Sequence, residues 1–406
     1  MSATQNERVL IAGAGPVGLI AAYRLARDGV PVTVFEKENR LLDDPRAATT
    51  HPATLEMLAE LGLVDDVARL GLICREFCFW DRPTGDLVAN FDHELLADET
   101  DFPYVIQCEQ FKLASLAYDR LLAFDHVDVL FEHSVTDVAQ DDGGVTATVS
   151  APDGEQAFRG TYLIGADGGR SAVRKSANIA FEGFTYPERF VVFTTPFDFQ
   201  SVGDYSYRNY FADPDEWSNL FKVSGDGPPG LWRAVFPTGV DESDENVANE
   251  AAAQARMQKF FPKDGDYHII HTNIYVTHQR VAESLAKGRV FLAGDSAHVN
   301  NPIGGLGLNC GIHDAMNLTE KLLRVWNGEA GLEEMARYDI QRRTTNYEFV
   351  QAQTIQNKKR LEAKDPKMRA ENLKELSEIA SDPVRAKEFL LRSSLIASVR
   401  RAEKLG

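Results

Sequence analysis

Three glycines near the start of the chain follow the pattern G-x-G-x-x-G, which can hold a phosphate group. The residues of this turn are Gly13, Gly15, Pro16, Val17 and Gly18. Glycine lets the backbone approach a pyrophosphate closely, and the free N–H groups of a following helix favour its negative charge. We therefore expect a nucleotide cradle between a short strand, Val9–Ala12, and a helix that begins at Pro16.

An acidic residue lies at the end of the second strand, where the ribose of a bound nucleotide is expected. The helix should end at Asp28 and Gly29, Val32–Phe35 returns as a parallel strand, and Glu36 lies at its tip, eighteen residues beyond Gly18 (36 − 18). A carboxylate there can accept hydrogen bonds from both ribose hydroxyls and would repel a 2′-phosphate. The fingerprint alone does not separate NAD from FAD, and the same glycines also occur in tight turns that bind nothing.

Two later stretches repeat the combination of a buried strand and a polar turn. In GADGGRSAVRK the strand Tyr162–Ile164 runs into glycines around Asp167 and Gly168. In RVFLAGDSAH the strand Val290–Ala293 ends just before Asp295. The first of these stretches invites a second ligand contact, on the far side of the cradle from the first loop, and is equally well explained as a turn that binds nothing.

Composition excludes several classes of partner. The chain has 406 residues and a formal net charge of −18, which argues against a nucleic-acid surface or an anionic membrane. No run is long and apolar enough to span a bilayer. The four cysteines form no C-x-x-C pair, so we expect a reducing, cytoplasmic location. His268 and His271 lie three residues apart on an expected strand and face opposite sides, and no metal site is expected.

The succession of strands and helices predicts an α/β fold with α+β elements and a discontinuous first domain. Residues 1–180 and 282–330 would form a Rossmann-like nucleotide-binding domain with an inserted β-meander. Residues 181–281 are rich in aromatic strands and predict a second domain, a mostly antiparallel sheet that binds substrate. Residues 331–406 are charged and helical, and form a C-terminal helical segment.

The three stretches GAGPVG…Glu36, GADGGRSAVRK and RVFLAGDSAH…NPIGGLGLN, in this order, resemble the single-component FAD-dependent aromatic hydroxylases. These are the para-hydroxybenzoate hydroxylase-like group A flavoprotein monooxygenases, and the resemblance covers most of residues 8–326. It implies bound FAD, NADH or NADPH as co-substrate, and O₂. The reaction would be hydroxylation of a small phenolic or heteroaromatic substrate through a flavin hydroperoxide. The assembly that we consider for this protein is a homodimer.

The resemblance also carries cofactor roles onto individual residues. Glu36 would bind the adenosine ribose, Asp167 would serve both FAD and the passing nicotinamide, and Asp295 would bind the ribityl hydroxyls. Lys37 could meet a 2′-phosphate that Glu38 would oppose, so the choice between NADH and NADPH stays open. The cofactor-binding residues are Gly13, Gly15, Pro16, Val17, Gly18, Glu36, Lys37, Arg46, Gln107, Asp167, Gly168, Asp295, Gly307, Leu308 and Asn309. Among these, Arg46 is equally well explained as a solvated loop residue.

The loop after Asp295 is expected to carry the flavin ring. Pro302 would lie at the flavin edge near the substrate, as one catalytic candidate. The backbone of Gly307, Leu308 and Asn309, at a helix N-terminus, would face the pyrimidine end of the ring. Reduced flavin is anionic at that end, and free N–H groups with the helix dipole stabilise an anion there.

No motif identifies the substrate residues. Tyr207 is our first choice for a catalytic group that contacts the phenol, and Tyr210 is the second choice for a substrate contact. Alternation along a strand puts these two tyrosines on opposite faces, and the sequence does not say which face looks at the flavin. Arg208, Arg233 or a histidine could hold a substrate carboxylate.

Other functions are compatible with the same scaffold. An epoxidase or an FAD-linked reductase would share the nucleotide motifs, and so would a flavin-binding sensor without catalytic activity. A flavin halogenase is disfavoured because the chain has no W-x-W-x-I-P stretch, since Trp217 and Trp232 stand apart. Substrate-dependent consumption of NAD(P)H separates a hydroxylase from a sensor.

Overall fold

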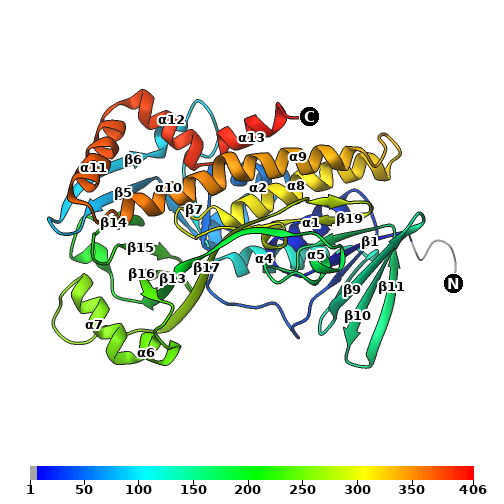
Figure 1. The fold of residues 1–406 in the computed structure, drawn as a ribbon, viewed down its shortest axis with the longest axis horizontal. Coiled ribbons are helices and arrows are strands. Elements are labelled where there is room, and N and C mark those ends of the chain that lie inside the picture. The colour runs from blue at the N-terminus through cyan, green and yellow to red at the C-terminus, as the bar shows by residue number, and fades with distance from the viewer. Residues whose placement is uncertain (1–6) are drawn as a thin grey trace.

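The computed structural model describes residues 7–406 (Figure 1). Its nucleotide-binding part is built on a six-stranded sheet of order β18-β19-β12-β1-β2-β8. Neighbouring strands are parallel except β18, which runs antiparallel to β19. The strands are β1 (Val9–Ala12), β2 (Val32–Phe35), β8 (Val127–Leu130), β12 (Tyr162–Gly165), β18 (Ala286–Lys287) and β19 (Val290–Leu292).

Helices cover this sheet because its central strands are apolar along their whole length. All residues of β1, β2 and β12 are buried, as is typical of parallel strands covered on both faces. Helix α1 (Pro16–Arg27) packs between α4 (Gln110–Leu121) and α8 (Gly307–Trp326). The fold therefore fixes the start of α1 and the start of α8 relative to the ends of the strands.

A second sheet has eight strands in the order β20-β17-β13-β16-β15-β14-β5-β6. The strands are β5 (Glu76–Asp81), β6 (Asp86–Asp92), β13 (Phe181–Thr195), β14 (Arg208–Ala212), β15 (Ser218–Val223), β16 (Leu231–Gly239), β17 (His271–Ala282) and β20 (His298–Val299). All pairs are antiparallel except β14 with β5. The mostly antiparallel sheet expected for residues 181–281 is present. It extends beyond them, since β5, β6 and β20 come from segments assigned to the first domain.

The two faces of the eight-stranded sheet are covered by different parts of the chain. One face packs on α6 (Asp244–Ala248) and α7 (Glu250–Phe260) through a core that includes Phe193 and Trp232. The C-terminal helices cover part of the other face, and Figure 1 shows α11 and α12 beside β5 and β6. The C-terminal elements are α9 (Glu334–Thr345), a π-helix η5 (Asn346–Gln351), α10 (Ala352–Leu361), α11 (Pro366–Ser381), α12 (Pro383–Ser393) and α13 (Ile396–Glu403).

Smaller elements complete the fold. The expected meander is a three-stranded antiparallel sheet of β9 (Ser134–Asp141), β10 (Gly144–Ala151) and β11 (Gly154–Gly160). Another small sheet joins β3 (Thr49–Thr50), β7 (Val105–Gln107) and β4 (Leu72–Cys74). The remaining helices are α2 (Pro52–Glu60), α3 (Val64–Leu70), α5 (Ala172–Ser176), η2 (His93–Leu96), η3 (Phe199–Ser201) and η4 (Gly294–Ser296). Within residues 7–406, no helix has both the length and the apolarity that crossing a membrane requires.

Candidate functional site

A cleft of about 650 Å³ lies between the two large sheets. One wall is formed at the carboxyl ends of three neighbouring parallel strands, β1, β12 and β19, where ligands of open α/β sheets bind. The opposite wall is formed by strands β13 to β17 of the eight-stranded sheet. The residues of that wall are Val192, Tyr210, Asn219, Phe221, Val223, Arg233, Val235, Asn273, Ile274, Tyr275, Val276, Thr277 and His278.

The glycines of the first turn are not all required for the same structural reason. A Cβ atom on Gly13, which has φ of +101°, would lie 2.4 Å from the backbone oxygen of Ala166. A Cβ on Gly18 would lie 2.1 Å from the backbone oxygen of Gly13. Gly15 differs, because a Cβ there would meet no protein atom within 4 Å and would project into the cleft. Gly13 and Gly18 are therefore needed for close packing, and Gly15 leaves room for a ligand.

Glu36 and its neighbours stabilise the loop behind this turn. The Glu36 carboxylate accepts hydrogen bonds from the N–H of Ala14 (2.8 Å) and of Glu38 (3.1 Å). The exposed Lys37 side chain pairs with Glu38 at 3.3 Å. Neither Glu36 nor Lys37 is among the residues that line the cleft. The bonds to Ala14 and Glu38 position the carboxylate of Glu36 beside the glycine turn.

The Asp167 turn contributes backbone to the cleft. One Asp167 carboxylate oxygen accepts from the Ser171 hydroxyl (2.5 Å), and the other accepts from the N–H of Ala172 (2.7 Å). These bonds cap α5, so the side chain of Asp167 stabilises the turn while Gly168 and Gly169 line the cleft. The geometry gives Asp167 a positioning role, whereas the sequence suggested direct contacts to cofactors.

The carboxylate of Asp295 faces the cleft from the end of β19. Its side chain is open to the cleft, yet the surrounding protein removes enough water to raise the pKa of Asp295 above its ordinary value. His298 and Arg46 act in the opposite direction, and Arg46 lines the same cleft. A carboxylate in this position accepts hydrogen bonds from hydroxyl groups.

The loop that contains Pro302 leads into a helix N-terminus that points at the cleft. Pro302, Gly307 and Leu308 line the cleft, and α8 has no side-chain cap at its start. The amide of Asn309 is used internally, because its oxygen accepts from the N–H of His51 (2.8 Å) and its nitrogen donates to the Thr49 carbonyl (2.8 Å). The free N–H groups at the start of α8 can therefore hold a negatively charged ligand edge.

A buried amide also lacks a protein partner in this cleft. Gln107 is fully buried, and its oxygen accepts from the Thr49 hydroxyl at 2.7 Å. Its Nε2 has no hydrogen-bond partner within residues 7–406. An unpaired buried donor is costly, which makes this nitrogen suited to a ligand acceptor.

These features fit an extended dinucleotide. The space at Gly15, the uncapped starts of α1 and α8, the Asp295 carboxylate and the free Gln107 nitrogen lie around one cleft. Two positive helix ends suit the phosphates and an anionic ring edge, and Asp295 suits a polyhydroxyl chain.

Comparison with known proteins decides which dinucleotide. A family model described as an FAD binding domain matches residues 6–353. The chain is 32% identical to the para-nitrophenol 4-monooxygenase of Pseudomonas sp. strain WBC-3, over 98% of this chain and 97% of that protein. The chain belongs to the FAD-dependent aromatic hydroxylases. The family, the FAD cofactor and the single-component monooxygenase class predicted from the sequence are confirmed, and NAD(P)H is the co-substrate typical of these enzymes.

Two further relatives extend this result. The hydroxylase is 32% identical to the 6-hydroxy-3-succinoylpyridine 3-monooxygenase of Pseudomonas putida strain S16, covering 89% of this chain and 91% of that one. Its fold matches the crystal structure of p-nitrophenol 4-monooxygenase from Pseudomonas putida DLL-E4 with a TM-score of 0.89. That structure is 33% identical and covers 95% of this chain and 96% of its own.

In this hydroxylase the two candidate tyrosines face opposite sides of the eight-stranded sheet. Tyr210 lines the cleft, and its hydroxyl accepts a hydrogen bond from Arg208 at 3.0 Å. Tyr207 does not line the cleft, and its ring lies 5.2 Å from the Lys222 ammonium, which also contacts the ring of Trp232. Tyr210 is therefore the tyrosine that can reach a substrate.

Arg233 lines the cleft but is bound to the protein. It donates to the carbonyls of Pro45 and Arg46, the latter at 2.6 Å, and to the Tyr275 hydroxyl at 3.1 Å. These bonds connect the loop that carries Arg46 to the eight-stranded sheet. Sequence reasoning missed Thr49 and Tyr275 as cleft residues, since neither lies in a motif.

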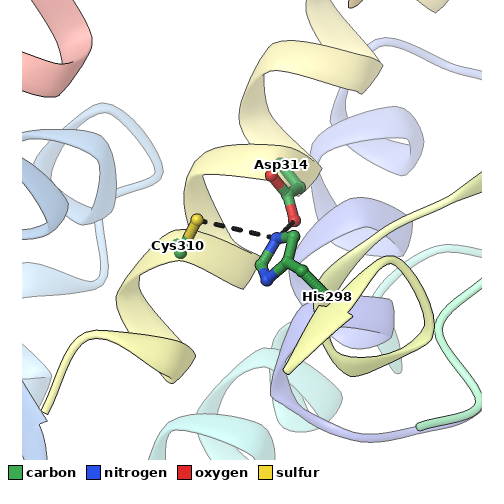
Figure 2. A group of neighbouring side chains, drawn as sticks. All are labelled: His298, Cys310 and Asp314. Carbon is green, nitrogen blue, oxygen red and sulfur yellow. Dashed lines mark hydrogen bonds and ion pairs between the residues drawn. The ribbon is translucent and has the colours of Figure 1, made fainter. Parts of the chain in front are cut away.

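A buried charge network lies beneath the Asp295 loop (Figure 2). Asp314 accepts from His298 Nε2 (2.6 Å), from Arg342 Nε (2.8 Å) and from the N–H of Gly294 (3.0 Å). The Cys310 sulfur lies 3.6 Å from His298 and 3.2 Å from Arg342. His298, Cys310 and Asp314 are close enough to be considered as metal ligands, but the guanidinium of Arg342 already contacts two of them.

The network is held together by opposite charges. Burial alone would lower the pKa of His298, but Cys310 and Asp314 raise it well above its ordinary value. Burial would raise the pKa of Asp314, yet His298 and Arg342 lower it. These interactions favour the charged form of each group, and the hydrogen bonds of Asp314 link the Gly294 loop to α8.

Proposed function

We propose that this hydroxylase adds one oxygen atom to a small phenol or hydroxypyridine, using NADH or NADPH and O₂. The observation that carries the proposal is that one continuous cleft joins the dinucleotide cradle at Gly15 to the sheet face that bears Tyr210. Two relatives that align over about nine-tenths or more of this chain's length are named for a nitrophenol and a hydroxylated pyridine. Small hydroxylated rings are therefore the first substrates to test.

Bound FAD supplies hydride acceptance and oxygen activation, and the chain's own groups set the conditions for both. Cofactor contacts are proposed for Gly13, Gly15, Pro16, Val17, Gly18, Glu36, Arg46, Gln107, Gly168, Asp295, Gly307 and Leu308. The free N–H groups at the start of α8 would stabilise negative charge on the ring edge that they face. Asp295 would hold the ribityl hydroxyls.

The sheet wall orients the substrate and keeps water away. Val192, Phe221 and Val235 give an apolar surface on the cleft side of the sheet. The Tyr210 hydroxyl accepts from Arg208, so its own proton is free to be donated to a substrate oxygen. Pro302 is proposed to lie at the edge between ring and substrate, where a rigid residue limits the entry of water.

The test is a substrate screen with the purified holoenzyme. NADH and NADPH oxidation would be followed with 4-nitrophenol, 4-hydroxybenzoate, 6-hydroxynicotinate and a larger polycyclic phenol, with product mass measured for each. The proposal expects at least one small ring to stimulate oxidation and to give a product with one added oxygen. Oxidation that no ring stimulates, or that yields only hydrogen peroxide, would contradict it.

A cytoplasmic location and a homodimer are also proposed. The four cysteines are buried and unpaired, which suits a reducing compartment. Phe184 and Tyr347 are each nearly half exposed and are side chains that a dimer interface would cover. Sedimentation of the holoenzyme at several concentrations tests the dimer.

A further inference from the structure

The loop between β20 and α8 has one side on the cleft and the other side on buried polar groups. Val299, Asn300 and Pro302 line the cleft. Asn301 and Ile303, on either side of Pro302, are at most 1% exposed and are not among the lining residues. Groups that bind Asn301 and Ile303 therefore act on the cleft through the loop, without touching a ligand there.

The amide of Gln279 joins three segments of the chain. Gln279 lies on β17 next to Thr277 and His278, which line the cleft, and it is buried. Its oxygen accepts from the backbone N–H of Asn301 at 3.1 Å and from the Asn301 side chain at 3.4 Å. Its nitrogen donates to the Thr354 hydroxyl on α10 at 3.0 Å. One side chain of the eight-stranded sheet therefore holds the loop and a C-terminal helix together.

The C-terminal helices bind the same loop at two further points. Gln351, the last residue of the π-helix η5, donates to the Val299 carbonyl at 3.4 Å. Asn357 of α10 donates to the Ile303 carbonyl at 3.3 Å. Both side chains are buried, and π-helices occur often at functional sites. The segment 351–357 therefore supplies donors on both sides of Pro302.

The bonds of Gln279 leave neither end of its amide without a partner. The Tyr186 hydroxyl also donates to its oxygen, at 3.4 Å, and the Asn301 side chain reaches that hydroxyl at 3.3 Å. A buried polar network in which every group has a partner favours a single arrangement of the segments that it joins. The network therefore gives the Pro302 loop one position relative to the eight-stranded sheet.

We propose that Gln279 is a positioning residue for the hydroxylation reaction, because it fixes the loop that carries Pro302 against the eight-stranded sheet. The assignment rests on the proposed function, which places Pro302 at the edge between ring and substrate. It adds that β17 and the C-terminal helices together favour hydroxylation over the release of hydrogen peroxide. A shift of about 1 Å can lower a reaction rate about a hundredfold, and a displaced loop would also admit water.

The test compares Q279M and Q279E with the wild-type holoenzyme, and Q341M is the matched control. Gln341 is also a buried glutamine, and its amide binds Asn317 and the Leu405 carbonyl, none of which lines the cleft. The measured quantity is product formed per NAD(P)H consumed, with the ring that best stimulates oxidation by the wild type. We expect Q279M to lower it at least about threefold, with hydrogen peroxide in place of product. Q279E keeps the acceptor for Asn301, so it should stay within about twofold of the wild type, as should Q341M.

A second measurement needs no aromatic substrate, which keeps this inference separate from the proposed function. The visible circular dichroism of oxidised FAD reports how the protein surrounds the ring. Q279M should change this spectrum, and Q341M should not. T354V removes the acceptor on α10 but leaves Gln279 in place, so it should change the spectrum in the same direction by a smaller amount.

The outcomes separate the two ideas. If the spectrum changes as expected but no ring gives a hydroxylated product, Gln279 positions the loop and the proposed function fails. If Q279M keeps the wild-type product ratio and spectrum, or if Q341M changes both as far as Q279M does, the positioning role is overturned. If Q279M does not fold, a wild-type spectrum for T354V overturns it.

Discussion

Two groups of buried charge lie beside the cleft, and they differ in how the protein satisfies them. Beneath the Asp295 loop, Asp314 is hydrogen-bonded by His298, Arg342 and the Gly294 N–H. Beside the eight-stranded sheet, the Arg208 side chain makes one hydrogen bond within residues 7–406, to the Tyr210 hydroxyl. Removing one partner of a buried charge pair destabilises the fold, so paired charges contribute to stability. A buried charge without a partner can instead bind a ligand of opposite charge. We infer that the first group stabilises the fold, and we propose that Arg208 in the second is available to a ligand.

The largest effect should follow from breaking the paired network. D314N would leave His298 and Arg342 buried without a counter-charge, and removing one partner of a buried pair typically costs about 3–5 kcal/mol. We expect denaturant unfolding of the holoenzyme to show a loss of that size, together with weaker FAD retention, because the Gly294 loop loses its anchor. A variant as stable as the wild type would contradict the structural role.

Two variants of the glycine turn separate an effect on stability from an effect on FAD binding. G13A would place a Cβ against the backbone of Ala166 at a positive φ, and we expect a loss of about 3 kcal/mol of apoprotein stability. G15A meets no protein atom, so its apoprotein should stay within about 1 kcal/mol of the wild type while FAD binds at least about tenfold more weakly. Chemical unfolding and FAD titration of both apoproteins measure the difference. Equal behaviour of the two variants would break the assignment.

The smallest effect on stability should come from the lone charge. R208Q removes a buried cation together with its hydrogen bond to the Tyr210 hydroxyl and leaves no buried charge behind, so the unfolding free energy should stay within about 1 kcal/mol of the wild type or rise above it. R342Q is the matched control, because it removes an arginine from the paired network. We expect its unfolding free energy to fall by several times more than that of R208Q. If R208Q were as destabilised as R342Q, Arg208 would be part of the fold and the contrast would disappear.

The parts of the site that depend on local chain geometry could be predicted from the sequence. Gly13, Gly15 and Gly18 lie within six residues of one another, and the turn they need is dictated by sterics. Asp295 follows a recognisable strand, and its position at the strand end places it in the cleft. The helical C-terminal segment and the β-meander could also be predicted, because hydrophobic periodicity and turn residues are local signals.

The parts that depend on distant segments could not be predicted. Strand β5 joins β14 across more than a hundred residues of chain, and no local pattern encodes that pairing. The choice between Tyr207 and Tyr210 turned on which strand face meets the cleft, and a period of two leaves that open. His51 and Arg208 come together from separate segments, so each looked like an ordinary helix-entry or strand residue. For Asp167, the hydroxyl of Ser171 four residues later was a signal that its carboxylate caps a helix.

The most direct test of the central claim is the origin of the oxygen in the product. The holoenzyme would be supplied with NAD(P)H, 4-nitrophenol and isotopically heavy O₂, and the product mass would be measured. The account predicts one heavy oxygen atom in the ring product, with NAD(P)H consumed in step with it. A product without the label, or consumption of NAD(P)H with hydrogen peroxide as the sole product for every phenol and hydroxypyridine in the screen, would contradict it.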